Sequence, residues 1–209
     1  MTAFVDRLIG VARAEWERFG RQEANLHPPS PRGIKESDER VFQRVGDYWR
    51  FIGGDYAHLT GKSTSQPWSA AFISFCMHEA GAGEMGPHAM FPYSPGHSVY
   101  INRAISNKAK GLMDAPIVGH KLGDYAPKVG DLIGYWRGDV AVTYDTARAI
   151  GWYPAHTDIV VAVDVPNRHA YSIGGNVGDS VTKREVALDA DGLLIDTKQK
   201  WFVAIENNM

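Results

Sequence analysis

The stretch QPWSAAFISF, from Gln66 to Phe75, places a serine where a nucleophile can lie. Pro67 and Trp68 lead into small residues and a large apolar run, which predicts the first turns of a buried helix. Ser69 then sits near the positive end of the helix macrodipole, beside unpaired backbone N–H groups. Such groups stabilise the anion that forms on an attacked carbonyl, so the position suits acyl transfer. A serine there is also a common cap or first-turn residue, which is the alternative interpretation.

A base and an orienting group occur further along the chain. The stretch AHTDIVVAV puts His156 at the entrance of an apolar strand, and GGNV puts Asn176 just after the next strand. In a hairpin the end of one strand lies beside the start of its neighbour, so Asn176 can approach His156. Asp158 is a rival orienting group, because residues two apart in a strand share a face. A loop histidine and a turn asparagine are the ordinary structural alternatives.

The loop FPYSPGHSVYI, after the predicted nucleophile helix, carries aromatic and polar side chains. Such groups can line a groove for a peptide or a glycan. We therefore assign substrate binding to Tyr93, Ser94 and His97 of this loop, together with Trp68 at the start of the predicted helix. The alternative is a loop that only caps the following helix through Ser98.

Bulk composition excludes several classes of function. Among 209 residues, 44% are hydrophobic and the net charge is −2, so no basic surface points to nucleic acid. No apolar run approaches the roughly 20 residues that a membrane helix needs. Asp6, Arg7 and Arg13 interrupt the apolar N-terminal stretch, which excludes an ordinary signal peptide. We expect a protein made in the cytoplasm, with no membrane span, whose export would need a secretion machine or a phage lysis system.

The sequence implies no metal or organic cofactor. Cys76 is the only cysteine, so neither an intrachain disulfide nor a cysteine-based zinc site can form. The eight histidines lack the H-E-x-x-H spacing, and the glycines of IGGNVGD are not followed by Lys-Ser or Lys-Thr. Cys76 itself lies among apolar residues and is expected to be a core thiol.

The order of the predicted elements indicates an α+β domain, with helices first and an antiparallel sheet afterwards. Apolar periodicity predicts helices over 2–20 and 37–52, a third that Ser65 caps and that ends at Gly81, and a fourth over 98–110. Strands are predicted over 131–136, 158–165, 170–175, 180–188 and 201–206. We divide the chain into an N-terminal helical region, 1–60, packed on the core, and a main domain, 61–209.

Four segments in succession, PWSAAFISF, PKVGDLIGYW, HTDIVVAV and IGGNV, resemble the papain-like cell-wall hydrolases of the NlpC and CHAP type. Those proteins have a Trp-Cys-Ala-x-Phe-like helix start, a Gly-Asp-Leu strand, a histidine at the next strand and a polar residue on the one after. Gly130-Asp131-Leu132 matches the second element, His156 the third and Asn176 the fourth. The resemblance covers roughly residues 65–180. The run looks more closely like a little-characterised bacterial family in that group with Trp-Ser-Ala-Ala-Phe.

The resemblance implies a papain-like fold and amide hydrolysis in peptidoglycan, within stem peptides or at the sugar–peptide link. By this resemblance Ser69 attacks, His156 is the base and Asn176 orients the imidazole. The implied partners are a peptidoglycan peptide or glycan, together with an immunity or delivery protein if the chain is an antibacterial toxin or effector that reaches the periplasm.

The sequence departs from that pattern at the nucleophile, where the family has cysteine and this chain has Ser69. A thiol of pKa about 8.5 can become a stable thiolate at such a site. A serine hydroxyl must instead lose its proton to a base during the attack. Three explanations stay open: a working serine enzyme, a degenerate site that only binds wall peptide or a partner, and an introduced Cys→Ser replacement. An esterase or lipid acyl hydrolase is a further alternative, which would need an apolar acyl groove.

Overall fold

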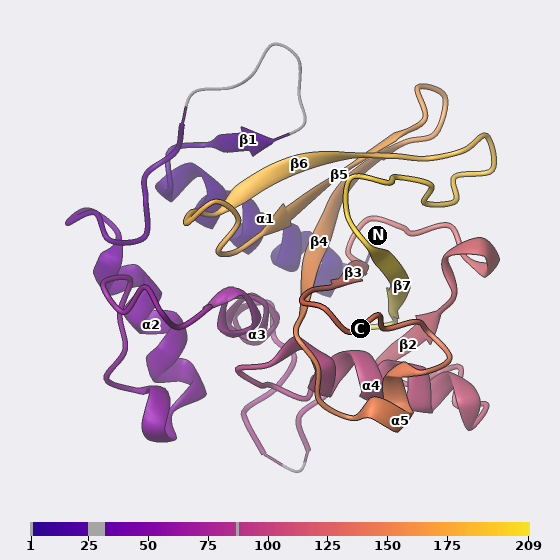
Figure 1. Cartoon of the computed structure of the whole chain (residues 1–209), viewed down its shortest axis with the longest axis horizontal. Helices are drawn as coiled ribbons and strands as arrows, with labels where there is room; N and C mark the ends of the chain where they lie inside the picture. Colours follow the sequence, from indigo (N-terminus) through magenta and orange to yellow (C-terminus); the bar gives the residue numbers. More distant parts are fainter. Residues whose placement is uncertain (1, 25–31, 87) are drawn as a thin grey trace.

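The computed structural model describes residues 2–24, 32–86 and 88–209, which form a helical layer packed on a seven-stranded sheet (Figure 1). The helices are α1 Ala3–Arg18, α2 Phe42–Ile52, α3 Ser69–Glu79, α4 His97–Ala109 and α5 Ala147–Ile150. The strands are β1 Gln22–Ala24, β2 Ile117–His120, β3 Leu132–Trp136, β4 Ala155–Asp164, β5 His169–Gly174, β6 Thr182–Ala187 and β7 Trp201–Asn207. The predicted α+β class is confirmed, whereas the papain-like fold remains a prediction.

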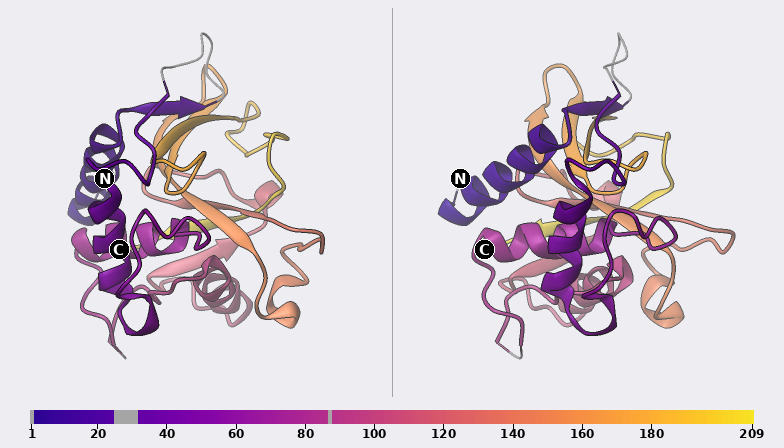
Figure 2. Two further views of the ribbon diagram at one scale, coloured as in Figure 1. Left: turned by 60° about the vertical axis from the view of Figure 1, so that its left-hand side comes forward. Right: turned by 90° about the vertical axis from the view of Figure 1, so that its left-hand side faces the viewer.

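The sheet has the strand order β1-β6-β5-β4-β3-β7-β2. β1 runs parallel to β6, and every other neighbouring pair is antiparallel. α3 lies between α2 and the sheet (Figure 1), and it contacts β4 and β5. Figure 2 shows α2 on the outer side of α3. The start of α3 is therefore enclosed by α2 on one side and by the central strands on the other.

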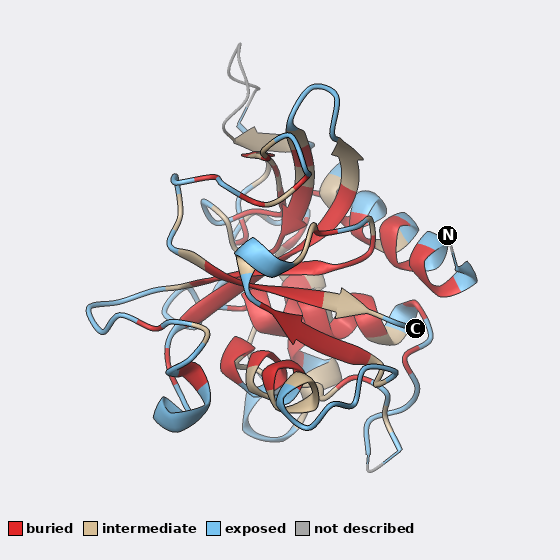
Figure 3. Cartoon of the chain, turned by 90° about the vertical axis from the view of Figure 1, so that its right-hand side faces the viewer, coloured by how far each residue is buried: buried red, intermediate tan, exposed pale blue. Residues whose placement is uncertain are grey.

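Side-chain alternation divides the sheet into two buried faces. On β4, Ile159 belongs to the main core with the helices, whereas Val160 belongs to a smaller core on the opposite face. The smaller core is closed by the connection between β6 and β7, in which Leu188 and Leu194 pair as an isolated bridge. Both faces are covered, and Figure 3 shows the central strands buried along most of their length. This alternation decides which polar side chains of β4 meet the helices.

Most predicted elements are confirmed, with differences at the edges. α2 begins at Phe42 rather than at 37, and α3 begins at Ser69 because turns precede it. Ser65 therefore does not cap α3, whose N-cap residue is Trp68. The sequence analysis missed β1 and β2, since the three-residue run QEA and the four-residue run IVGH are too short to show an alternating pattern. β4 begins at Ala155, so His156 lies inside the strand and not before it.

The N-terminal helices share the main core. Leu8 and Ala12 of α1 and Val45 of α2 have no exposed surface and belong to the same apolar cluster as Ile159 of β4. α1 also contacts α3, β4 and β5. α1 and α2 therefore belong to the main core, and the division of the chain into 1–60 and 61–209 remains a prediction.

We expect Leu8→Ala to lower the free energy of unfolding by about 2–5 kcal/mol, because it leaves a cavity in the main core. Leu112→Ala is the matched control, since the Leu112 side chain is 51% exposed. Urea denaturation should show the large loss only for Leu8→Ala. Equal stability of the two variants would show that α1 is not part of the cooperative core.

Candidate functional site

Ser69 is the first residue of α3, and its hydroxyl is hydrogen-bonded to a histidine. The partner is His97, the first residue of α4: Ser69 Oγ lies 2.6 Å from His97 Nε2. Sequence reasoning had assigned His97 to substrate binding and His156 to the role of base. This correction depends on the placement of α4 against α3 and β4, which no local sequence pattern encodes.

The other ring nitrogen of His97 is held by two hydroxyl groups. His97 Nδ1 lies 3.1 Å from Thr157 Oγ1 and also contacts the Tyr100 hydroxyl, which is itself 3.1 Å from Thr157 Oγ1. If Nδ1 carries the proton and donates to one of these oxygens, Nε2 is free to accept the Ser69 proton. If Tyr100 donates to Nδ1 instead, Nε2 donates to Ser69 and cannot act as its base. The tautomer of His97 therefore decides whether Ser69 is activated.

His97 is held in its neutral form. Burial lowers the pKa of His97 well below its usual value, and the nearby His156 and the positive charge of Arg137 act in the same direction. The imidazole is 5% exposed. A neutral ring can accept a proton near neutral pH, as a general base must.

His156 belongs to a second polar group, on the opposite side of β4. Its Nε2 lies 2.9 Å from Asp158 Oδ1, and Asp158 Oδ2 lies 2.9 Å from Arg184 Nε and accepts from Ser172 Oγ at 3.0 Å. Because alternate residues of a strand share a face, His156 and Asp158 point away from the side where Thr157 meets α4. No hydrogen bond joins Ser69 to His156 within the described residues. The structure confirms the expectation that Asp158 and His156 share one face of β4.

The two histidines nevertheless meet at the entrance of β4. The ring centroids of His97 and His156 are 5.1 Å apart. The Tyr135 ring also packs on His156, with ring centroids 5.0 Å apart. His156 Nδ1 is buried and has no hydrogen-bond partner in the described part of the chain. Since Nε2 donates to Asp158, this nitrogen carries a lone pair, a buried acceptor without a donor.

Charges around Asp158 compensate for its burial. Burial raises the pKa of Asp158, but the Arg184 charge and the His156 hydrogen bond outweigh it and leave the pKa below its usual value. Burial also lowers the pKa of His156, against the opposing effect of Asp158. Sequence reasoning missed Arg184, although a signal existed: Arg184 stands between Thr182 and Val186 on the buried face of its strand. A charge in that position requires a partner.

Asn176 does not orient either imidazole. With its amide group turned to satisfy both neighbours, Asn176 donates to Glu36 Oε2 at 3.1 Å and accepts from the backbone N–H of Trp68 at 3.3 Å. Trp68 Nε1 donates to the same Glu36 oxygen at 2.5 Å. Asn176 has a φ of 55°, which suits a turn after β5. The structure corrects the expectation: Asn176 fixes the residue before Ser69, and Asp158 holds His156.

Gly174 and Gly175 allow β5 to pass close to both groups. A Cβ at Gly174 would lie 1.9 Å from Asp158 Oδ1, and one at Gly175 would lie 2.6 Å from Phe72 Cβ on α3. Any side chain at either position would displace the Asp158 carboxylate or the start of α3. These glycines therefore bring α3 and β4 together. They match no phosphate-binding loop.

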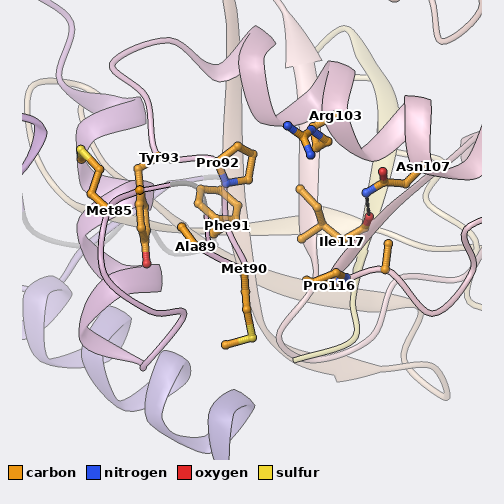
Figure 4. A pocket seen from close by; sticks show the side chains of 12 residues that line it. Met85, Ala89, Met90, Phe91, Pro92, Tyr93, Arg103, Asn107, Pro116 and Ile117 are labelled. Atoms are coloured by element: carbon orange, nitrogen blue, oxygen red, sulfur yellow. Dashed lines mark hydrogen bonds between the residues drawn. The ribbon is translucent and has the colours of Figure 1, made fainter.

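The other predicted substrate-binding residues have structural roles here. Trp68 is 1% exposed and packs against the Phe19 and Tyr48 rings, so it offers no surface to a ligand. Ser94 exchanges hydrogen bonds with Ser74 through its backbone. Of the predicted set, Tyr93 lines a cavity (Figure 4).

Access to Ser69 requires movement. Ser69, His97 and His156 are 3%, 5% and 0% exposed, so a substrate can reach the Ser69 hydroxyl only after a neighbouring side chain shifts. The cavity of Figure 4 approaches from one side: its Phe91 wall packs on Tyr100 with ring centroids 4.9 Å apart. Tyr100 contacts His97, so two aromatic layers separate this cavity from the Ser69–His97 pair.

The residues that the structure describes contain no group of three or more His, Cys, Asp or Glu side chains placed to hold a metal ion. None of their helices is both long enough and apolar enough to cross a membrane.

We expect Arg184→Gln to lower the free energy of unfolding by about 3–5 kcal/mol, because it leaves the buried Asp158 carboxylate without its charge partner. Lys183→Gln on the same strand is the control, since it breaks a partly exposed ion pair with Glu23 and a cation–π contact with Trp16, each worth about 1 kcal/mol or less. Chemical denaturation measures both. A small effect of Arg184→Gln would mean that Asp158 is neutral or solvated.

We expect the protein to lose stability as the pH falls below about 6.5, the usual histidine value. In that range the unfolded chain protonates histidines that the fold keeps neutral, at a cost of about 1.4 kcal/mol per pH unit for each one. Asp131, whose pKa burial raises to about 6, acts in the opposite direction at lower pH. Comparison of wild type with His97→Gln cancels that contribution. Urea denaturation at several pH values should give a shallower pH dependence for His97→Gln, and an unchanged one would contradict a neutral buried His97.

Comparison with known proteins gives one match. No curated protein and no solved structure matches the chain. A family with the description "Uncharacterized protein conserved in bacteria (DUF2272)" matches residues 36–206, from Glu36 beside Trp68 to the end of the sheet. The match spans most of the chain and includes Ser69, His97, His156, Asp158 and Arg184. The chain therefore belongs to this bacterial family.

Proposed function

We propose that this protein is a hydrolase that attacks an acyl carbonyl with Ser69. The observation that carries the proposal is the 2.6 Å contact between Ser69 Oγ and His97 Nε2 at the N-terminus of α3. A hydroxyl needs a base within hydrogen-bond reach, and a helix start supplies both backbone N–H donors and a favourable dipole. The contact brings these three requirements together at one buried residue.

In the proposed reaction His97 Nε2 takes the Ser69 proton while Oγ bonds to the carbonyl carbon. Backbone N–H groups in the first turn of α3 stabilise the oxyanion. The protonated imidazole then gives its proton to the leaving group, and the bond between that group and the carbonyl carbon breaks. Water, with His97 again as the base, hydrolyses the resulting acyl-enzyme and restores Ser69. Thr157 and Tyr100 would hold His97 in the required tautomer, a role that a carboxylate has in other serine hydrolases.

The substrate class of the proposal comes from the resemblance to papain-like cell-wall hydrolases. We propose an amide bond of peptidoglycan, in the stem peptide or at the sugar–peptide link, and a papain-like arrangement of α3 against β4 and β5. Delivery to the periplasm, and an immunity or delivery protein as partner, belong to the same proposal. Incubation with purified peptidoglycan and mass analysis of the fragments would identify the bond. Intact peptidoglycan after prolonged incubation would remove this substrate class.

A second candidate is ester hydrolysis, which the cavity of Figure 4 favours. Serine suits ester chemistry, and this cavity offers apolar side chains to an acyl group. Phe91 and Tyr100 separate it from the Ser69–His97 pair, so these rings would have to shift before an acyl carbon could reach Ser69. Chromogenic acyl esters of increasing chain length would test it. Hydrolysis of esters together with inert peptidoglycan would favour this candidate over the first.

We expect Ser69→Ala to abolish turnover and Ser69→Cys to retain or raise it against an amide. The thiol would replace one oxygen by one sulfur, in surroundings that lower a thiol pKa through the helix start and a nearby histidine. Initial rates on peptidoglycan fragments measure both. A binding-only protein would give no turnover in any form while retaining wall peptide in a pull-down. Undiminished turnover in Ser69→Ala would remove Ser69 from the mechanism.

We expect His97→Ala to reduce the catalytic rate constant more than His156→Ala, by about 100-fold or more, the usual contribution of a general base. His156 should act mainly through stability, because its hydrogen bond goes to Asp158 and not to Ser69. Rates should be compared at a pH where circular dichroism shows both variants folded. The reverse order would return His156 to the role of base that the sequence pattern predicts.

A further inference from the structure

The cavity in Figure 4 combines apolar side chains with one cationic side chain. Its volume is about 440 Å³, within the range of small-molecule sites. Met85, Met90 and Tyr93 lie toward one side, from the loop that precedes α4. Arg103 and Asn107 of α4 lie toward the other, beside Ile117 of β2. One positive charge therefore marks one end of a lining that mixes apolar and polar surface.

The apolar end leaves methionine side chains exposed. Met85 is 47% exposed and Met90 is 42% exposed, although most large apolar side chains of this protein are buried. Methionine is flexible and polarizable, and it is over-represented at surfaces that adapt to apolar ligands. Two exposed methionines in the lining of one cavity indicate a surface that a ligand can cover.

The opposite wall is fixed before any ligand arrives. Asn107 Nδ2 donates to the backbone oxygen of Ile117 at 2.8 Å, which ties α4 to β2 at the cavity edge. Phe91 closes the floor and packs on Tyr100. A rigid wall facing an adaptable one lets a ligand bind with little loss of protein conformational freedom.

Arg103 supplies the charge that selects the ligand. Its side chain lies on the exposed part of α4 and forms no ion pair within the described residues. The carboxylate of Glu84, beside Met85 in the chain, is turned to His78 at 3.5 Å. The guanidinium is thus available for a carboxylate or phosphate group, which it can bind through two parallel hydrogen bonds.

We propose that this cavity is a binding site for a small amphipathic anion, an apolar chain or ring that ends in one carboxylate or phosphate group. The apolar part lies against Met90 and Tyr93, which are both accessible, and the anionic group lies against Arg103. The site goes beyond the proposed hydrolase, because binding requires no reaction at Ser69. Its use as an acyl-group subsite, by contrast, rests on that proposed function.

Octanoate, octanamide and acetate test separately the apolar part and the anionic group of the proposed ligand. Octyl phosphate, compared with octanoate, tests whether the site prefers a phosphate or a carboxylate group. Isothermal titration of the full chain near neutral pH should show octanoate binding about tenfold tighter than octanamide, since only the anion pairs with Arg103. Acetate should bind too weakly to detect, because it lacks the apolar part. Equal affinities for octanoate and octanamide would overturn the role of Arg103, and detectable acetate binding equal to that of octanoate would overturn the role of the apolar wall.

Three variants locate the site. Arg103→Gln should remove the preference for octanoate over octanamide, whereas Arg148→Gln, an exposed arginine that lines a different cavity, should leave it unchanged. Ala115→Phe fills the cavity from a partly exposed position and should weaken binding of both ligands. Loss of the preference in Arg148→Gln but not in Arg103→Gln would place the site elsewhere. The Ser69→Ala variant should bind octanoate as wild type does, so failure of the hydrolase proposal would not affect this result.

Discussion

A carboxylate with no exposed surface, Asp158, sets a condition that three strands must satisfy together. Burying an uncompensated charge costs several kcal/mol, so each oxygen of Asp158 needs a donor. His156 supplies one from β4, Ser172 another from β5 and Arg184 the charge from β6. A one-residue register shift of β5 would turn Ser172 to the other face, and one of β6 would turn Arg184 away, which would leave His156 as the remaining partner of the buried carboxylate. The central sheet therefore has one register in which this charge is tolerated.

The same strand serves two separate polar groups because its side chains alternate. Thr157 faces the helices and joins His97 and Tyr100, whereas His156 and Asp158 face Tyr135 and Arg184. The Thr157–His97 group can move protons at the start of α3. The His156–Asp158 group holds β4, the strand that carries Thr157, in place. The order of segments that resembles papain-like hydrolases runs through both groups. A motif match alone could not tell which histidine meets the nucleophile, since neighbouring residues of one strand point in opposite directions.

The long, strongly patterned elements could be predicted from sequence, and the contacts between them could not. The apolar stripe of α1, the nearly continuous apolar runs of β3, β4 and β7 and the alternation of β6 predicted these elements, because burial selects such patterns. The three-residue β1 owes its place to pairing with β6, which local sequence does not encode. Ser69 was a sound candidate because a helix start concentrates N–H groups. Its partner was missed because His97 reaches it across 28 positions of sequence, through the packing of two helices. The position of Asn176 after β5 was predicted correctly. The turn in which it lies, however, directs its side chain to Trp68 and Glu36.

The near-complete burial of Ser69 has a consequence for how tightly any substrate can bind. A ligand that binds only an open form of the protein can bind only the fraction of molecules that are open. If that fraction is about 1%, the apparent dissociation constant rises about 100-fold above the intrinsic one. The hydroxyl is then shielded from bulk water and from unintended acyl compounds for most of the time. Selectivity would reside in the opening event, so a compound that reacts readily in solution but cannot favour the open form would be a poor substrate.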